Sequence, residues 1–196
     1  MKADVRSRRW ATMVAILAAG ALLAGCATTA ASTTGDATTT ATPPAAAATP
    51  LQPAPTFQVR DVQGQTVAVP AGRPVVLLFG AASGCASCAV SEQQMAQVYP
   101  QFKHQAEFVT VDVTPGDTKA AVLSFAQQLG ASWPAVLAQG TNLLTLYHIS
   151  ALNTMYVLNA RSQIVSHSDT GLSPAQLRVA LQRALKPAGG RGTVSA

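Results

Sequence analysis

The segment that decides the fold is Pro74-Val-Val-Leu-Leu-Phe79, which is followed after five intervening residues by Cys85-Ala-Ser-Cys88. An unbroken apolar run of this length is typical of a strand that is buried on both faces of a sheet. The residues from Ala89 to Val98 have helical character. The two cysteines are therefore predicted to lie where a buried strand leads into a helix.

Strand and helix patterns alternate on both sides of this segment. They predict strands at 57–59, 66–69, 107–113, 154–158 and 163–167, and helices at 117–129 and 174–185. Ser173-Pro174 gives the last helix an N-cap and a proline at its first position. The order predicts an α/β fold with a mixed central sheet and helices on both faces. The first two strands are expected to form an N-terminal β-hairpin around the Gln63-Gly64 turn.

Two cysteines at the start of a helix favour thiol–disulfide exchange. The unpaired N–H groups and the dipole of a helix N-terminus stabilise a thiolate, which is the attacking species in exchange. Cys85 is therefore the candidate nucleophile. Cys88, one turn later, can attack the mixed disulfide and release the product. The spacing C-x-x-C alone is a weak signal, but at a strand-to-helix junction of a βαβ chain it is a specific one.

The N-terminal end is typical of an export signal. Residues 1–25 have a basic beginning, an apolar core and the ending Leu23-Ala24-Gly25, directly before Cys26. This ending resembles the lipobox of bacterial lipoproteins, which implies cleavage before Cys26 and lipidation of its thiol. The protein would then be exported and lipid-anchored to the cell membrane, facing the periplasm or the cell exterior. An ordinary cleaved signal and an uncleaved anchor helix are the alternatives.

Composition divides the rest of the chain into a tether, a domain and a tail. Residues 26–56 are rich in alanine, threonine and proline and lack large apolar side chains, which predicts a disordered tether. Residues 57–186 carry the strand and helix patterns, and 187–196 are expected to be flexible. The net charge of +5 overstates the basicity, because nine basic and seven acidic residues follow residue 25. The charge therefore gives no support for nucleic-acid binding.

Four segments carry a resemblance to a known family. They are Ala54-Pro55-Thr56-Phe57 with Asp61 and Gly64, Arg73–Phe79 with the cysteine pair, Trp133-Pro134-Ala-Val-Leu137, and Tyr147-His148-Ile149. Over about residues 54–186 the chain resembles thioredoxin-fold proteins of the TlpA type, in the redoxin (AhpC/TSA) superfamily. These are membrane-tethered thiol–disulfide oxidoreductases of bacterial cell envelopes. The resemblance implies an enzyme in which Cys85 attacks and Cys88 resolves. Its partners would be protein thiol or disulfide clients and an upstream redox partner.

The chain departs from that family at two positions beside the cysteines. Gly84 stands where the family usually has tryptophan, and Asn153 stands before Thr154 where the family has a cis-proline. A cis bond before a non-proline residue costs about 2.5–4 kcal/mol, so a trans bond is expected. Asn153 also adds a polar amide beside the dithiol. With Trp133-Pro134 at the rim, these residues are expected to line or modulate a substrate groove.

Several other interpretations of the pair stay open at this stage. The cysteines could form a structural disulfide, although a four-residue loop gains little from closure. Copper chaperones of the Sco type share the fold but use C-x-x-x-C and a later histidine than His148. The peroxiredoxin pattern P-x-x-x-T-x-x-C would place Ala81 and Cys85 at its proline and threonine positions. A redox-inactive interaction domain is a further alternative.

Other expectations concern cofactors, assembly and neighbouring acids. We expect a monomer with neither a cofactor nor a bound metal. The residues leave open whether the pair reduces or oxidises its clients. Glu92, a turn after Cys88, is expected to be solvated. Asp112 ends a strand, and no catalytic role is assigned to it.

Overall fold

The computed structural model of the protein describes residues 50–187. The predicted signal peptide, the lipidation site Cys26, most of the tether and nearly all of the tail lie outside these residues. Within 50–187, no helix is long and apolar enough to span a membrane.

The centre of the domain is a five-stranded mixed sheet with the order β5-β4-β3-β6-β7. Its strands are β3 (Val75–Gly80), β4 (Glu107–Asp112), β5 (Ala135–Leu137), β6 (Thr154–Leu158) and β7 (Ile164–Ser168). β3 pairs in parallel with β4 and antiparallel with β6, so it is the central strand. All six of its residues are buried, as its unbroken apolar sequence predicts.

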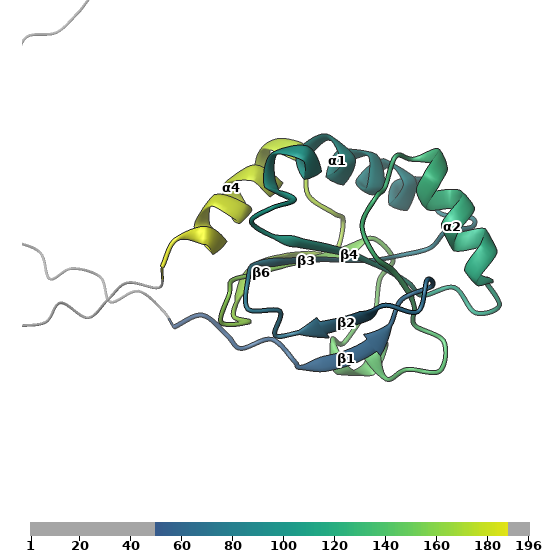
Figure 1. The fold of residues 1–196 in the computed structure, drawn as a ribbon, viewed down its shortest axis with the longest axis horizontal. Coiled ribbons are helices and arrows are strands. Elements are labelled where there is room, and N and C mark those ends of the chain that lie inside the picture. The colour runs from purple at the N-terminus through teal and green to yellow at the C-terminus, as the bar shows by residue number, and fades with distance from the viewer. Residues whose placement is uncertain (1–49, 188–196) are drawn as a thin grey trace, which may run out of the picture. The chain divides into compact units, whose positions relative to one another are not determined.

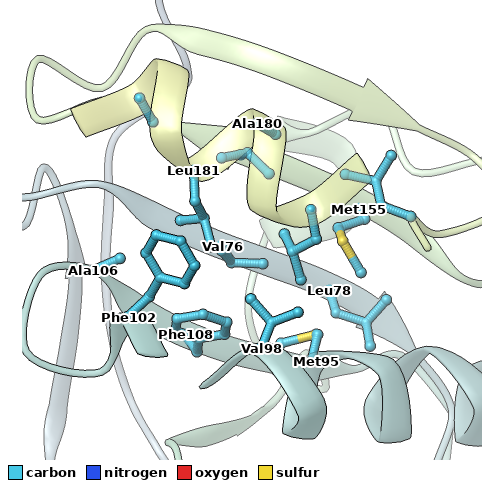
Figure 2. Close-up of a cluster of buried hydrophobic side chains, with 14 of the residues drawn as sticks. Val76, Leu78, Met95, Val98, Phe102, Ala106, Phe108, Met155, Ala180 and Leu181 are labelled. Atoms are coloured by element: carbon cyan, nitrogen blue, oxygen red, sulfur yellow. The ribbon is translucent and has the colours of Figure 1, made fainter. Parts of the chain in front are cut away.

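One face of the sheet is covered by three helices: α1 (Ala86–Phe102), α2 (Lys119–Gln128) and α4 (Pro174–Leu185). Figure 1 shows the sheet edge-on with these helices on one side. Val76 and Leu78 of β3 point into this layer, where they meet Met95 and Val98 of α1 and Leu181 of α4 (Figure 2). Burying each such side chain stabilises the fold by about 1.5–3 kcal/mol.

The opposite face is covered mainly by a β-hairpin. Strands β1 (Phe57–Arg60) and β2 (Thr66–Val69) pair antiparallel and lie below the sheet in Figure 1. The short helix α3 (Leu143–Leu146) completes this layer, where Leu77 and Phe79 of β3 pack with Val67, Val69, Leu143 and Tyr147. Helices therefore lie on both faces as expected, but the second face has only one turn of helix beside the hairpin.

The predicted helix and strand patterns are confirmed, and two short elements were missed. The strand β5 has three residues and α3 has four, which is too short for hydrophobic periodicity to identify them. Helix α1 also extends past the predicted end at Val98 and contains Pro100 in its last turn. The N-cap at Ser173 forms a complete capping box with Gln176.

The end of the predicted tether contacts the domain. The N–H of Ala54 donates to the carbonyl of Ser162 at 2.7 Å, and the N–H of Ile164 donates to the carbonyl of Gln52 at 2.8 Å. The Tyr147 hydroxyl donates to the carbonyl of Pro55 at 2.8 Å. Residues 52–55 are thus hydrogen-bonded to the rest of the domain before β1 begins.

Two glycines with the same left-handed backbone allow a matched stability test. Gly130 and Gly171 both have φ of +73°, but a Cβ at Gly130 meets nothing within 4 Å. A Cβ at Gly171 would overlap the Oγ of Ser91 and crowd the amide of Asn153. Gly130→Ala should lower the free energy of unfolding by about 1–2 kcal/mol, the cost of the left-handed conformation. Gly171→Ala should lower it by about 2–5 kcal/mol, because overpacking is added to the same conformational cost.

Equilibrium denaturation in urea measures both variants. Equal losses of unfolding free energy would show that Ser91 and Asn153 do not press against Gly171.

Candidate active site

Cys85 and Cys88 lie at the start of α1 and are joined by a disulfide, with their Cα atoms 5.3 Å apart. Cys85 is the N-cap residue of the helix. Its sulfur accepts a hydrogen bond from the backbone N–H of Cys88 at 3.2 Å and lies 3.5 Å from the hydroxyl of Ser87. The first turn of α1 contains no acidic residue. The N–H of Cys88 and the dipole of the helix N-terminus favour negative charge on the Cys85 sulfur.

The two sulfurs differ in their access to solvent. Cys85 is half-buried, and its neighbours Gly84, Ala86 and Ser87 are exposed. Cys88 is only 1% exposed. A Cβ at Gly80 would lie 3.3 Å from both the Cβ and the Sγ of Cys88, so the end of β3 lies directly against this side chain. An incoming group therefore reaches Cys85 and not Cys88.

A small cavity of about 10 Å³ lies behind Cys88. Apolar side chains of α2, among them Val122 and Phe125, form part of its lining. Its polar lining comes from Cys88 and Glu92 of α1, Thr110 and Asp112 of β4, and the indole of Trp133. The indole N–H of Trp133 donates to the Thr110 hydroxyl at 3.0 Å. This space is about the size of one water molecule.

Glu92 is buried in this cavity, so the expectation that it is solvated was wrong. It is 2% exposed, and its Oε2 has no hydrogen-bond partner among the described residues. Burial raises the pKa of Glu92 from 4.5 to about 7, and a hydrogen bond with the Thr110 side chain acts in the opposite direction. The sequence held a signal for this burial, because Glu92 is four residues after Cys88 and three before Met95, on the same helix face.

Asp112 is the second buried acid of the cavity and is 2% exposed. Burial raises the pKa of Asp112, and the nearby charge of Asp117 adds to the increase. Hydrogen bonds from the backbone N–H groups of Ala82 and Thr114 act against it. Two carboxyl groups thus line the space behind the buried sulfur of the disulfide.

The predicted groove residues occupy different places around the pair. Asn153 is 5% exposed with φ of +70°, and its side chain lies beside Ser91 of α1 at Gly171. Its Oδ1 has no partner among the described residues. The peptide bond before Asn153 is trans, since Val69-Pro70 is the cis bond of the described chain. Thr154 is buried and donates to the carbonyl of Ala151 at 2.9 Å.

The remaining predicted residues separate into two groups. Gly84 is exposed beside Cys85, and Trp133 reaches the cavity behind Cys88. Pro134 does not line that cavity. It lines, with Trp133, Asp61 and Gln127, a separate groove of about 400 Å³ between α2 and the β1–β2 hairpin connection. The structure therefore places Gly84 beside Cys85 and Asn153 beside Ser91 of α1, whereas Trp133 packs against Tyr99 further along the helix and Pro134 lines the separate groove.

The raised pKa of Glu92 predicts a pH dependence of stability. Between pH 4.5 and 7 the folded chain binds more protons at Glu92 than the unfolded chain does, so the free energy of unfolding falls as pH rises through this window. The total loss is about 3 kcal/mol, which is reached above pH 7. Glu92→Gln should remove this loss, as measured by urea denaturation across the pH range.

Glu107→Gln serves as the control for that measurement. Glu107 is a partly exposed acid paired with Arg73 at 2.9 Å, and replacing it leaves Glu92 intact. The control should keep the wild-type fall in stability between pH 4.5 and 7. A Glu92→Gln variant with that same fall would exclude Glu92 as its source.

The chain is similar in sequence to other proteins. The chain is 32% identical over 115 residues to the thiol-disulfide oxidoreductase ResA of Bacillus subtilis, covering 57% of this chain and 63% of the relative. It is 30% identical over 123 residues to the Mercury resistance operon ORF3 protein of Streptomyces lividans, covering 61% and 64% respectively. The matched region spans a little under two thirds of each of these relatives.

Solved structures share the fold. A thiol:disulfide interchange protein of the thioredoxin family from Chlorobium tepidum superimposes with a TM-score of 0.62 at 21% identity, covering 71% of this chain and all of the other. StoA from Bacillus subtilis superimposes with a TM-score of 0.57 at 23% identity, covering 67% and 98%. The predicted thioredoxin-like fold is thereby confirmed. The AhpC/TSA family matches residues 50–167, which is more than half of the sequence, and the chain belongs to that family.

Proposed function

We propose that the protein is a thiol–disulfide oxidoreductase that exchanges the Cys85/Cys88 dithiol with disulfides of envelope proteins. The observation that carries this proposal is the unequal burial of the two sulfurs at one helix N-terminus. Cys85 is accessible and accepts a backbone N–H, whereas Cys88 is buried directly behind it. This is the arrangement that an attacking and a resolving cysteine require. The relatives named thiol-disulfide oxidoreductase support the same activity.

The exchange is a balanced two-step reaction. The Cys85 thiolate attacks one sulfur of a client disulfide, so that a mixed disulfide forms and the second client sulfur leaves as a thiolate. Cys88 then loses its proton and attacks the Cys85 sulfur, which restores the Cys85–Cys88 disulfide and releases the reduced client. Two electrons pass from the pair to the client. The reverse sequence oxidises a client dithiol, and an upstream partner returns the pair to its starting state.

Glu92 is placed to exchange a proton with Cys88 in the second step. Both side chains line the same small cavity, which the client does not enter. With a pKa of about 7, the Glu92 carboxyl can both hold and release a proton near neutral pH. An ionised Glu92 can accept the Cys88 proton when the mixed disulfide is resolved, which leaves the Cys88 thiolate beside a neutral acid.

The rim around Cys85 is the proposed client groove. Gly84 leaves the approach to the Cys85 sulfur open, since this exposed position carries no side chain. Thr154 pairs with Phe79 at the end of β3, so it and Asn153 support this rim from inside, and Trp133 lines the cavity behind Cys88. Ser150 and Leu152, in the loop before Asn153, are the exposed residues that a client would contact on this side.

Other activities fit the site less well. The positions that orient peroxide in the pattern P-x-x-x-T-x-x-C are occupied by Ala81 and Cys85. A carrier of copper or another thiophilic metal is the alternative, and one relative is named after a mercury resistance operon. Within residues 50–187, the two cysteines lie in no group of three or more histidine, cysteine or acidic side chains that could hold a metal, so a soft ion would have only the two sulfurs. Dithiol exchange needs only the two sulfurs.

We also propose that the domain is tethered to the outer side of the cell membrane through lipidated Cys26. The support is the sequence Leu23-Ala24-Gly25-Cys26 at the end of an export signal. The 23 residues that separate Cys26 from Pro50 could extend to roughly 70 Å at about 3.1 Å per residue. Clients would then be exported proteins within this distance of the membrane.

Single-cysteine variants test the exchange mechanism. In a Cys26→Ala background, which leaves two thiols, Cys88→Ser should accumulate a mixed disulfide with a disulfide-containing peptide, because the resolving sulfur is missing. Cys85→Ser should form at least tenfold less adduct, since Cys88 is buried. Mass spectrometry of the intact chain measures both products.

The same assay separates the alternatives. Equal adduct formation in the two variants, or a reduced wild-type pair that leaves glutathione disulfide unchanged, would contradict the proposed function. Stoichiometric Cu(I) uptake by such an exchange-inactive pair would favour a metal carrier. Turnover of hydrogen peroxide that needs Cys88 and not Cys85 would favour a peroxidase.

A labelling experiment tests the tether. The full-length chain expressed in a bacterium should incorporate radiolabelled palmitate and sediment with membranes, because an acylated Cys26 anchors it. Cys26→Ala should remove the label and release the domain, whereas Cys85→Ser should retain both properties. Label that persists in Cys26→Ala would contradict lipidation at this residue.

A further inference from the structure

Asp112 is the last residue of β4. Its side chain connects the loop between β3 and the cysteines to the loop that follows β4. Its Oδ2 accepts the backbone N–H of Ala82 at 2.6 Å, and its Oδ1 accepts the backbone N–H of Thr114 at 3.0 Å. Ala82 is three residues before Cys85. Thr114 follows β4. Both oxygens of one buried carboxylate are therefore used to hold backbone, one on each side of the site.

Two further bonds connect the same loops. The N–H of Val113 donates to the carbonyl of Gly80 at 2.8 Å, which closes the strand pairing before Ala82. The Ser83 hydroxyl donates to the carboxylate of Asp117 at 3.1 Å, but this bond is exposed to solvent. Of the side-chain bonds to residues 81–84, only that of Asp112 is protected from solvent, so it is the one that can fix this loop.

The charge of Asp112 is balanced by N–H groups and not by a cation. The ion pairs of the described residues are Arg73–Glu107 and His167–Asp169, which do not include Asp112. Charge-assisted bonds to backbone N–H groups are roughly twice as strong as neutral ones. The Ala82 contact therefore depends on Asp112 being ionised.

We propose that Asp112 is a positioning residue for the exchange reaction, which holds Ala82 and thereby places the Cys85 sulfur at the start of α1. This inference rests on the proposed function of the pair. Ionised Asp112 keeps residues 81–84 ordered, so that Cys85 and Cys88 stay close in the reduced state and the disulfide closes readily. Protonated Asp112 accepts the Ala82 N–H weakly, and the loop loosens.

The groups that face Asp112 set the pH at which this occurs. Glu92 and Cys88 of α1 lie across the cavity, and Asp117 lies in the loop after β4. The cavity residues contributed by β3, α2 and β5 are not titratable; they are Leu78, Gly80, Val122, Phe125, Ala126 and Ala135. Because burial and Asp117 both raise the pKa of Asp112, the loop should loosen at a higher pH than it would around an ordinary aspartate.

Amide hydrogen exchange at Ala82 tests the contact directly. In the oxidised full-length chain, NMR should show an Ala82 amide protected at least tenfold relative to an unstructured peptide. The protection should fall as the Asp112 carboxyl protonates, and the Ala82 amide shift and the Asp112 side-chain carbon shift should titrate with the same midpoint. Different midpoints in the wild-type chain would overturn the proposal without any variant.

Three variants separate the contact from charge alone. Asp112→Asn should lose the Ala82 protection and its pH dependence. Asp117→Asn should keep the protection and move its midpoint to lower pH, because a neighbouring charge that raises the pKa of Asp112 is removed. Glu92→Gln should keep the Ala82 protection, since Glu92 does not contact that N–H.

Equilibration with glutathione gives the functional measurement. Asp112→Asn should make the Cys85–Cys88 disulfide at least tenfold easier to reduce, equivalent to about 30 mV. Asp117→Asn should change it by less than threefold. Unchanged Ala82 protection in Asp112→Asn, or equal effects of the two variants on the glutathione equilibrium, would overturn the positioning role. A wild-type pair that does not equilibrate with glutathione would instead contradict the proposed function, while the exchange data still test the Ala82 contact.

Discussion

The unpaired N–H groups at the start of α1 are the constraint on which the site depends. A helix cannot satisfy these groups internally, so something else must accept their hydrogen bonds. Here the sulfur of Cys85 takes that place through the N–H of Cys88. The helix can begin there because β3 ends at Gly80, whose missing side chain makes room for Cys88. The buried strand, the glycine and the helix start therefore fix where the Cys85 sulfur lies.

The two sulfurs lie in different electrostatic environments. The helix N-terminus stabilises an anion at the accessible sulfur, whereas Glu92 and Asp112 place carboxyl groups behind the buried one. A negative charge behind Cys88 disfavours its thiolate, and a neutral Glu92 removes part of that effect. The protonation of these acids, and not only the residues between the cysteines, thus determines how readily each sulfur ionises.

Most of the fold could be predicted from the sequence, and part of the site could not. The apolar run of β3, the hairpin around Gly64 and the capped helix at Ser173 have strong local signals, so their positions were correct. The strand β5 is three residues long and depends on pairing with β4, which local patterns do not reveal. Glu92 was missed because charged residues are seldom fully buried. The positions of Asn153 and Asp112 depend on contacts between segments that are distant in the sequence.

Trp133, whose indole donates to the Thr110 hydroxyl, gives the domain an intrinsic fluorescent probe. The sequence has two tryptophans, and Trp10 belongs to the predicted signal peptide, so the exported form would carry only Trp133. Its indole lines the same cavity as Cys88 and Glu92. Sulfur and carboxyl groups at such a position alter indole fluorescence. The emission of one ring would therefore report sulfur oxidation and proton binding in this protein without any added label.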